Sequence, residues 1–262
     1  MSFSIAGKTA IVTGSANGVG LAIARHFLEQ GANVMFADID EDRLIVEVGR
    51  TDGPARYFAG DLRQKLTIAN LVSATVDAFE RVDILVNASR QVVSFDPLRI
   101  GEDGVEQMLD QNLLTSLRVS QMVAKRMIAS APEDGQAGAI INLSSIAAHR
   151  TQANLMAYSI SCAALDQMTR SMAVALAANR IRVNALAIGS LLSASLQATL
   201  KDKPDFRAQI LAGTPLGRIA PATELVEAVQ FLASSAAGFI TGQILAVDGG
   251  RSLLDAVAAP AH

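Results

Sequence analysis

The sequence predicts an α/β fold in which a doubly wound, seven-stranded parallel sheet carries helices on both faces. Short β-branched runs alternate with longer amphipathic segments along all 262 residues. Strands that alternate with helices pair in parallel through right-handed crossovers. No internal repeat, low-complexity block or Pro/Gly-rich linker divides the chain, so we expect a single domain over residues 1–262. Open sheets of this kind bind ligands at the carboxyl ends of their strands.

Seven segments rich in β-branched and apolar residues are the predicted strands: Thr9–Val12, Asn33–Ala37, Arg56–Ala59, Asp83–Val86, Ala139–Leu143, Arg182–Ala187 and Gln243–Val247. Six segments with helical character lie between them: Gly18–Gln30, Arg43–Gly49, Lys65–Phe79, Gly104–Ile128, Asn154–Ala178 and Ala222–Ala233. Two segments fall outside this pattern. Gly189–Gly213 is a long insertion that forms either a substrate loop or a solvated helical flap. The Ala-rich tail, Leu253–His262, is either frayed or docked on a neighbouring subunit.

Composition excludes several classes of partner. The chain is 50% hydrophobic and 18% charged, and its longest apolar runs are too short to span a membrane, so the surplus apolar surface indicates a subunit interface. The net charge of −3 comes from interspersed signs, unlike a nucleic-acid-binding face. The three histidines lack metal-ligand spacing, and we expect no metal site. With no signal peptide recognisable and Cys162 the only cysteine, we expect a cytoplasmic protein.

The first predicted strand runs directly into a glycine-rich turn and then a helix. Residues 9–24 read TAIVTGSANGVGLAIA. Glycines permit a tight turn and a close approach of backbone to a diphosphate, and the helix N-terminus offers free N–H groups to the phosphates. This strand–turn–helix context predicts a Rossmann-type dinucleotide site. Its expected cofactor-binding residues are Gly14, Ser15, Asn17, Gly18, Val19 and Gly20.

Carboxylates at the ends of the second and third strands predict how the adenosine half is held. Asp38 lies eighteen residues beyond Gly20, where a carboxylate accepts hydrogen bonds from ribose hydroxyls and repels a 2′-phosphate. The glycine-rich turn supplies no cation for such a phosphate, so we predict NAD rather than NADP. An alternative is that Asp38 caps the helix at Arg43–Gly49. Asp61 and Leu62 follow the third strand and are expected to meet the adenine.

Further motifs occur in order along the chain. Thr13 joins Gly14, Gly18 and Gly20 in T-G-x-x-x-G-x-G, Asn112 lies in DQNLL, Ser145 in IINLSS and Tyr158 in AYSIS. The pattern G-x-x-x-x-V-D-G-G follows at Gly242, Val247, Asp248, Gly249 and Gly250, and PLGRIA occupies Pro215–Ala220. With these motifs the sequence resembles the short-chain dehydrogenase/reductase family over nearly its whole length, and PLGRIA looks like the 3-oxoacyl reductase-like branch.

The resemblance implies an oxidoreductase that acts on a small-molecule alcohol or carbonyl with a nicotinamide cofactor. Tyr158 would exchange a proton with the substrate oxygen, Ser145 would fix that oxygen, and Asn112 would hold a water of the proton relay. The long helices around Asn112 and Tyr158 commonly form a four-helix interface in this family. A homotetramer or homodimer is therefore expected.

The nicotinamide half departs from the family pattern at three places. The family's lysine four residues after the tyrosine is Cys162, which adds no positive charge to a phenol whose ordinary pKa is about 10. The family's N-N-A-G reads Asn87 to Arg90, so a long cation replaces a glycine beside the cofactor. The proline of the family's P-G turn is Ile188. Asn87, Arg90 and Cys162 are nevertheless the residues expected on this side of the cofactor.

Two functions remain open on these residues. The first is a working NAD-dependent dehydrogenase or reductase in which Arg90 restores the missing charge. The second is a pseudoenzyme, a dinucleotide-binding or structural subunit that can pair with an active homologue. A nucleophilic or redox role for Cys162 is a third reading, which we disfavour because no base or cation flanks it in sequence. Gln152, Asn154 and the Gly189–Gly213 insertion are expected to shape the substrate pocket, but they do not name the substrate.

Overall fold

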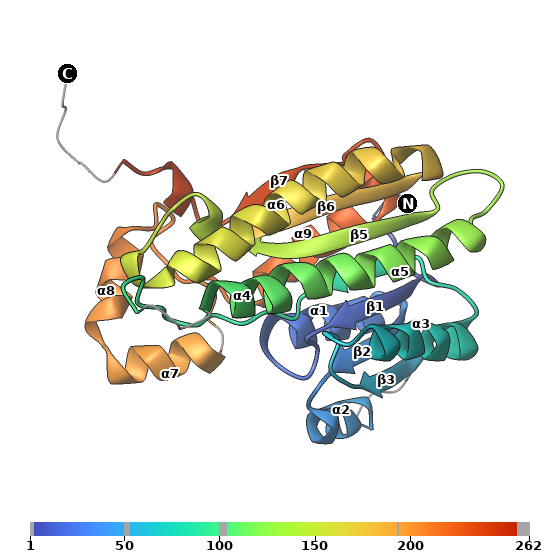
Figure 1. Ribbon diagram of the computed structural model, residues 1–262, viewed down its shortest axis with the longest axis horizontal. Coiled ribbons are helices and arrows are strands. Elements are labelled where there is room, and N and C mark those ends of the chain that lie inside the picture. The colour runs from blue at the N-terminus through green and yellow to red at the C-terminus, as the bar shows by residue number, and fades with distance from the viewer. Residues whose placement is uncertain (1–2, 50–52, 100–103, 193, 256–262) are drawn as a thin grey trace.

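The computed structural model describes residues 3–49, 53–99, 104–192 and 194–255 and confirms the predicted fold class. A seven-stranded sheet, parallel throughout, has the order β3-β2-β1-β4-β5-β6-β7 (Figure 1). Its strands are β1 (Thr9–Thr13), β2 (Asn33–Asp38), β3 (Ala55–Ala59), β4 (Ile84–Asn87), β5 (Gly138–Ser145), β6 (Ile181–Ile188) and β7 (Ile244–Val247). Because β1 lies between β2 and β4, the strand order reverses there, and a ligand site is expected beyond these two strands.

The α-helices of the described chain are α1 (Gly18–Glu29), α2 (Glu41–Val48), α3 (Lys65–Phe79), α4 (Gly104–Met108), α5 (Thr115–Ala129), α6 (Met156–Leu176), α7 (Ala194–Asp202), α8 (Asp205–Ala212) and α9 (Thr223–Ala233). The single helix expected at Gly104–Ile128 is interrupted. A π-helical turn, η1 (Leu109–Leu114), separates α4 from α5. Such turns insert an extra residue and often mark functional sites, and this one contains Asn112.

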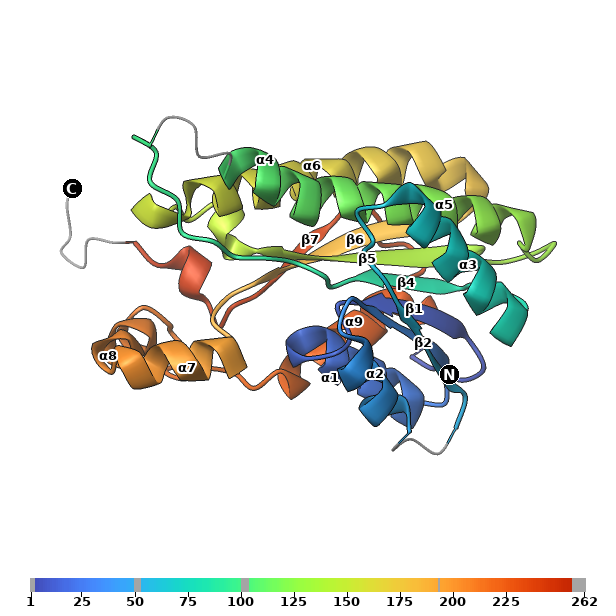
Figure 2. The ribbon, with the colours of Figure 1, turned by 60° about the horizontal axis from the view of Figure 1, so that its bottom comes forward.

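Two hydrophobic layers fix the sheet between its helices. Side chains alternate along β1, so that Ala10 and Val12 join the core under α1, α2 and α9, whereas Ile11 joins the core under α3, α5 and α6. Figure 2 shows these two helical layers on opposite sides of the sheet. None of the described helices is both long and apolar enough to cross a membrane.

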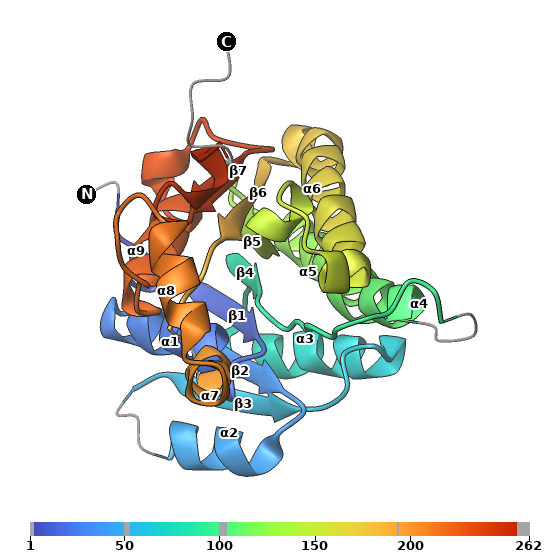
Figure 3. The ribbon, with the colours of Figure 1, turned by 90° about the vertical axis from the view of Figure 1, so that its left-hand side faces the viewer.

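The two unusual segments are only partly described. The Gly189–Gly213 insertion contains α7 and α8, on the same side of the sheet as α1 and α9 (Figures 2 and 3), while residue 193 lies outside the described residues. Leu191, near the start of the insertion, forms a β-bridge with Ala220, which follows the insertion in the chain. Of the predicted tail, Leu253–Asp255 is described, and residues 256–262, with His262, lie outside the described residues.

Candidate active site

The glycine-rich turn is closed so tightly that two of its glycines tolerate no side chain. A Cβ on Gly20 would lie 2.2 Å from the carbonyl oxygen of Gly14. A Cβ on Gly14, whose φ is +67°, would lie 2.7 Å from the Cα of Ser89. Thr13 joins this turn to the end of β4, because its hydroxyl oxygen accepts hydrogen bonds from the backbone N–H groups of Ala88 (3.0 Å) and Ser89 (3.2 Å).

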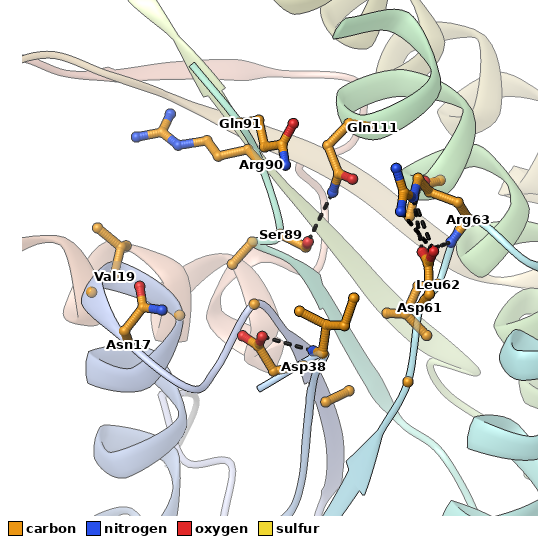
Figure 4. A pocket seen from close by; sticks show the side chains of 18 of the residues that line it. Asn17, Val19, Asp38, Asp61, Leu62, Arg63, Ser89, Arg90, Gln91 and Gln111 are labelled. Carbon is orange, nitrogen blue, oxygen red and sulfur yellow. Dashed lines mark hydrogen bonds and ion pairs between the residues drawn. The ribbon is translucent and has the colours of Figure 1, made fainter. Parts of the chain in front are cut away.

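A cavity of about 540 Å³ opens in front of this turn, at the carboxyl ends of β1, β2 and β4. Figure 4 shows Arg90 and Gln91 across the cavity from Asp38, and Asn17 and Val19 at the start of α1. Nine predicted cofactor-binding residues line it: Gly14, Asn17, Gly18, Val19, Gly20, Asp38, Asp61, Leu62 and Arg90. Sequence reasoning missed Ser89, Arg63, Gln111 and Thr115, which line it as well. A cavity of this size suits a small organic ligand or cofactor.

Asp38 is held at the cavity by backbone N–H groups from both sides. Its Oδ2 accepts from Ala16 of the glycine-rich turn at 3.0 Å, and its Oδ1 accepts from Ile39 at 2.7 Å. The alternative that Asp38 caps the following helix is wrong. Asp40 is the residue that caps α2, by accepting from the backbone N–H of Arg43 at 3.2 Å.

Asp61 is paired with an arginine that has no place in the sequence motifs. The Arg63 guanidinium donates to Asp61 Oδ2 at 2.7 Å, and this hydrogen bond holds the pKa of the Asp61 carboxyl below its usual range. Both residues line the cavity, next to the largely buried Leu62. This part of the cavity thus carries an ion pair rather than a lone carboxylate.

Ser15 and Asn87 lie differently from the expectation. Ser15 is fully buried, and its hydroxyl faces the carbonyl oxygen of Ala37 at 3.5 Å rather than the cavity. Asn87 is also buried and donates to Ser120 (2.9 Å) and Asn142 (2.8 Å) in the layer between the sheet and α5. Buried amides and hydroxyls require hydrogen-bond partners. Both side chains find theirs among buried protein groups, and neither lines the cavity.

Tyr158 and Ser145 come together at the end of β5, and Arg90 reaches them from the end of β4. Arg90 Nη1 donates to the Tyr158 hydroxyl at 3.0 Å and to the carbonyl oxygen of Ser144 at 3.3 Å. Tyr158 is only 4% exposed. Burial raises the pKa of Tyr158 above its ordinary value, and the positive charge of Arg90 and the Ser145 hydroxyl oppose this rise.

Cys162 lies one helical turn beyond Tyr158 and packs against it. Both residues belong to a small buried cluster with Ala147. Burial raises the pKa of the Cys162 thiol to about 11, so the sulfur is a neutral thiol near pH 7. This argues against a nucleophilic or redox role, which requires a thiolate. The positive charge next to the phenol comes from Arg90 instead.

Asn112 holds the backbone that carries Arg90. Its Oδ1 accepts from the N–H of Gln91 at 2.8 Å, and its Nδ2 donates to the carbonyl oxygen of Gln91 at 3.0 Å. The same Nδ2 lies 3.1 Å from the Ser161 hydroxyl on α6. The side chain therefore bonds protein groups from three segments, and the role of Asn112 as a water holder stays a prediction. The side chain joins η1, the segment after β4 and α6 at one point.

The cavity ends at Arg90. Neither Tyr158, Ser145 nor Cys162 is among the residues that line it, although Arg90, Gln91 and Val92 are. The guanidinium thus lies between the cavity and the tyrosine. Within the described residues, no group of three or more His, Cys, Asp or Glu side chains is placed to hold a metal ion.

Comparison with known proteins gives a consistent result. A family model described as "Enoyl-(Acyl carrier protein) reductase" matches residues 14–252. The chain is 36% identical over 255 residues to a cis-4-hydroxycyclohexanecarboxylate dehydrogenase of Sinomonas cyclohexanicum, covering 95% of this chain and 98% of that protein. It is 31% identical to a 3-oxoacyl-[acyl-carrier-protein] reductase of Chlamydia pneumoniae, covering 95% and 99% of the two chains. A structure of 7α-hydroxysteroid dehydrogenase complexed with NADH and 7-oxo glycochenodeoxycholic acid superposes with a TM-score of 0.87 at 30% identity, covering 95% and 96%.

Proposed function

The chain belongs to the short-chain dehydrogenase/reductase family, and from that membership we propose that it is an NAD-dependent oxidoreductase acting on an alcohol/carbonyl pair. Its relatives are dehydrogenases and reductases, which supports oxidoreductase chemistry in general. The observation that carries the more specific proposal is the 3.0 Å hydrogen bond from Arg90 to the Tyr158 hydroxyl. It gives a family member without the usual lysine a cation at the proton-transferring group.

The residues of the cavity fit the adenosine diphosphate half of the cofactor. The glycine-rich turn leaves backbone N–H groups at the start of α1 for the phosphates, and Asp38 offers a carboxylate for ribose hydroxyls. The negative charge of Asp38 disfavours a 2′-phosphate, which supports NAD over NADP. The bound cofactor would supply or accept the hydride.

The protein's own residues handle the proton. In carbonyl reduction, the Tyr158 hydroxyl gives its proton to the substrate oxygen and becomes a phenolate, and the reverse reaction returns that proton to it. Arg90 stabilises the phenolate without itself changing protonation, because a guanidinium stays charged at all ordinary pH values. Ser145, at the end of β5, hydrogen-bonds the substrate oxygen and so fixes the reacting carbon.

The wider assignments are part of the same proposal. We propose a single cytoplasmic domain whose substrate pocket is bounded by the Gly189–Gly213 insertion with Gln152 and Asn154. We also propose assembly as a homotetramer or homodimer. No nucleic acid or membrane partner is proposed.

The test is NADH-dependent reduction of a panel of ketones and aldehydes, monitored through the loss of NADH absorbance. We expect turnover that Tyr158→Phe lowers about 10²- to 10⁴-fold, the usual contribution of a general acid. NADH binding by that variant serves as the folding control, because Tyr158 does not line the cavity. Equal turnover by Tyr158→Phe and the native protein would overturn the mechanism.

A second candidate function is a catalytically impaired subunit that binds dinucleotide or pairs with an active homologue. It is favoured by the neutral thiol at position 162 and by the end of the cavity at Arg90. Cys162→Lys discriminates the two candidates. Dehydrogenase activity that appears only in this variant would make the native chain the inactive partner, whereas native turnover would remove this candidate.

A further inference from the structure

A buried carboxylate on α6 has no part in the proposed chemistry. Asp166 lies two helical turns beyond Tyr158 and is only 1% exposed. Neither of its oxygens makes a hydrogen bond of regular geometry within the described part of the chain, although the buried hydroxyl of Ser144 on β5 and the imidazole of His149 lie close to it. A buried charge whose partners are so loosely placed is costly, so such a group calls for an explanation.

His149 is the nearest group that can compensate this carboxylate. Its Nε2 lies 3.4 Å from Asp166 Oδ2, while most of the imidazole faces solvent, with 59% of the side chain exposed. Burial raises the pKa of Asp166, and the nearby Ser144 hydroxyl, His149 and Arg170 oppose this rise. The other titratable group that faces Asp166 is Cys162 on the same helix, which is a neutral thiol.

His149 and Ser145 are the two ends of one short hydrogen-bonded turn. The Ser145 hydroxyl accepts from the backbone N–H of Ala147 at 3.1 Å, and the N–H of His149 donates to the carbonyl oxygen of Ile146 at 2.9 Å. The turn η2 (Ile146–Ala148) between them is therefore closed by a hydrogen bond at each end, and only these three residues separate His149 from Ser145.

We propose that His149 and Asp166 are positioning residues, whose 3.4 Å contact holds the turn that carries Ser145 against the helix that carries Tyr158. The contact exists whatever the roles of Ser145 and Tyr158 are, but its catalytic meaning rests on the roles proposed for them. The imidazole covers the buried carboxylate and ties the turn to α6. A variant that lacks either side chain loses this contact, and the turn that carries Ser145 is then no longer tied to the helix that carries the phenol.

Ionisation of Tyr158 reports on the pair without any turnover. The chain contains two tyrosines and no tryptophan, so Tyr57→Phe leaves Tyr158 as the sole phenol in an ultraviolet pH titration. The Ser145 hydroxyl lowers the pKa of Tyr158. We therefore expect His149→Phe and Asp166→Asn, each in the Tyr57→Phe background, to reduce the phenolate fraction of Tyr158 at a given pH about threefold to tenfold, the net worth of one ordinary hydrogen bond.

The matched control is His26→Phe, also made in the Tyr57→Phe background. His26 hydrogen-bonds Gln230 at 2.6 Å on another face of the sheet, and its loss should leave Tyr158 unchanged.

The outcomes separate this inference from the proposed function. An unchanged Tyr158 titration in both variants overturns the positioning pair even if the enzyme turns over. Shifted titrations in a protein without turnover support the pair and count against the proposed function. If Asp166→Asn fails to fold, His149→Phe carries the test, because it changes a largely exposed side chain.

Discussion

Replacing Arg90 by alanine should lower the ionised fraction of the Tyr158 phenol. The guanidinium donates to the Tyr158 hydroxyl at 3.0 Å, and Tyr158 is 4% exposed, so little water screens the contact. An opposite charge at such range changes the ionised fraction of an acid about 10- to 1000-fold. Water that enters the truncated site restores part of this, which moves the expectation toward the lower end. We expect at least a tenfold loss of phenolate at a given pH.

The assay is the ultraviolet titration of Tyr158 in the Tyr57→Phe background. Arg90→Lys keeps a positive charge and should retain part of the effect, although it cannot reproduce the planar guanidinium. Arg63→Ala is the matched control, because it removes another cavity arginine whose partner is Asp61 rather than the phenol. Turnover of a carbonyl substrate should fall in Arg90→Ala by a similar factor. A Tyr158 titration that is identical in Arg90→Ala and its parent would refute the reasoning.

Three further outcomes are expected. Gly20→Ala should abolish NAD binding in titration calorimetry, because its Cβ would lie 2.2 Å from the carbonyl oxygen of Gly14, and normal affinity would contradict the close turn. Asp38→Ala should shift preference toward NADP by about tenfold, since it removes a charge that repels a 2′-phosphate; an unchanged ratio of the two dissociation constants would exclude Asp38 as the selector. Burial raises the pKa of the Cys162 thiol from 9.0 to about 11, so folding favours the neutral thiol. That stabilisation is complete below pH 9 and disappears as the pH rises through 11, so Cys162→Ala should flatten the decline of unfolding free energy over this interval in denaturant titrations.

The fold could be predicted because its signals are local and repeated. Each strand is marked by β-branched residues, and the turn after β1 is marked by the glycines that its tight backbone requires. The break in the helix at Asn112 was not predicted, because residues 105–128 contain no glycine or proline that would mark it. The choice between Asp38 and Asp40 as helix cap also depends on backbone direction at the end of β2, which composition does not encode.

The site was predicted where motifs specify it and missed where long side chains decide it. The residue types at Tyr158 and Ser145 are tied to fixed spacing, whereas the direction of the Arg90 side chain depends on several rotatable bonds. Arg63 reaches the cavity from a segment with no motif, and Gln111 lies next to Asn112 in DQNLL without being a residue that the motif specifies. The His149–Asp166 contact joins residues 17 positions apart whose proximity exists only once the turn after β5 packs on α6.

The cation that faces the phenol comes from a different element than in the family pattern, and this changes what must hold it in place. A lysine on α6 would be oriented by the helix itself, one turn from Tyr158. An arginine that follows β4 is rooted in irregular backbone and loses about 2 kcal/mol of side-chain entropy when ordered. Two features offset that cost here. Asn112 bonds both backbone groups of Gln91, next to Arg90, and Nη1 has a second acceptor in the carbonyl oxygen of Ser144. We therefore propose that Cys162 and Arg90 act together, in place of the lysine and the glycine that the family resemblance implies at positions 162 and 90. The thiol leaves the space beside the phenol without charge, and the anchored arginine supplies it.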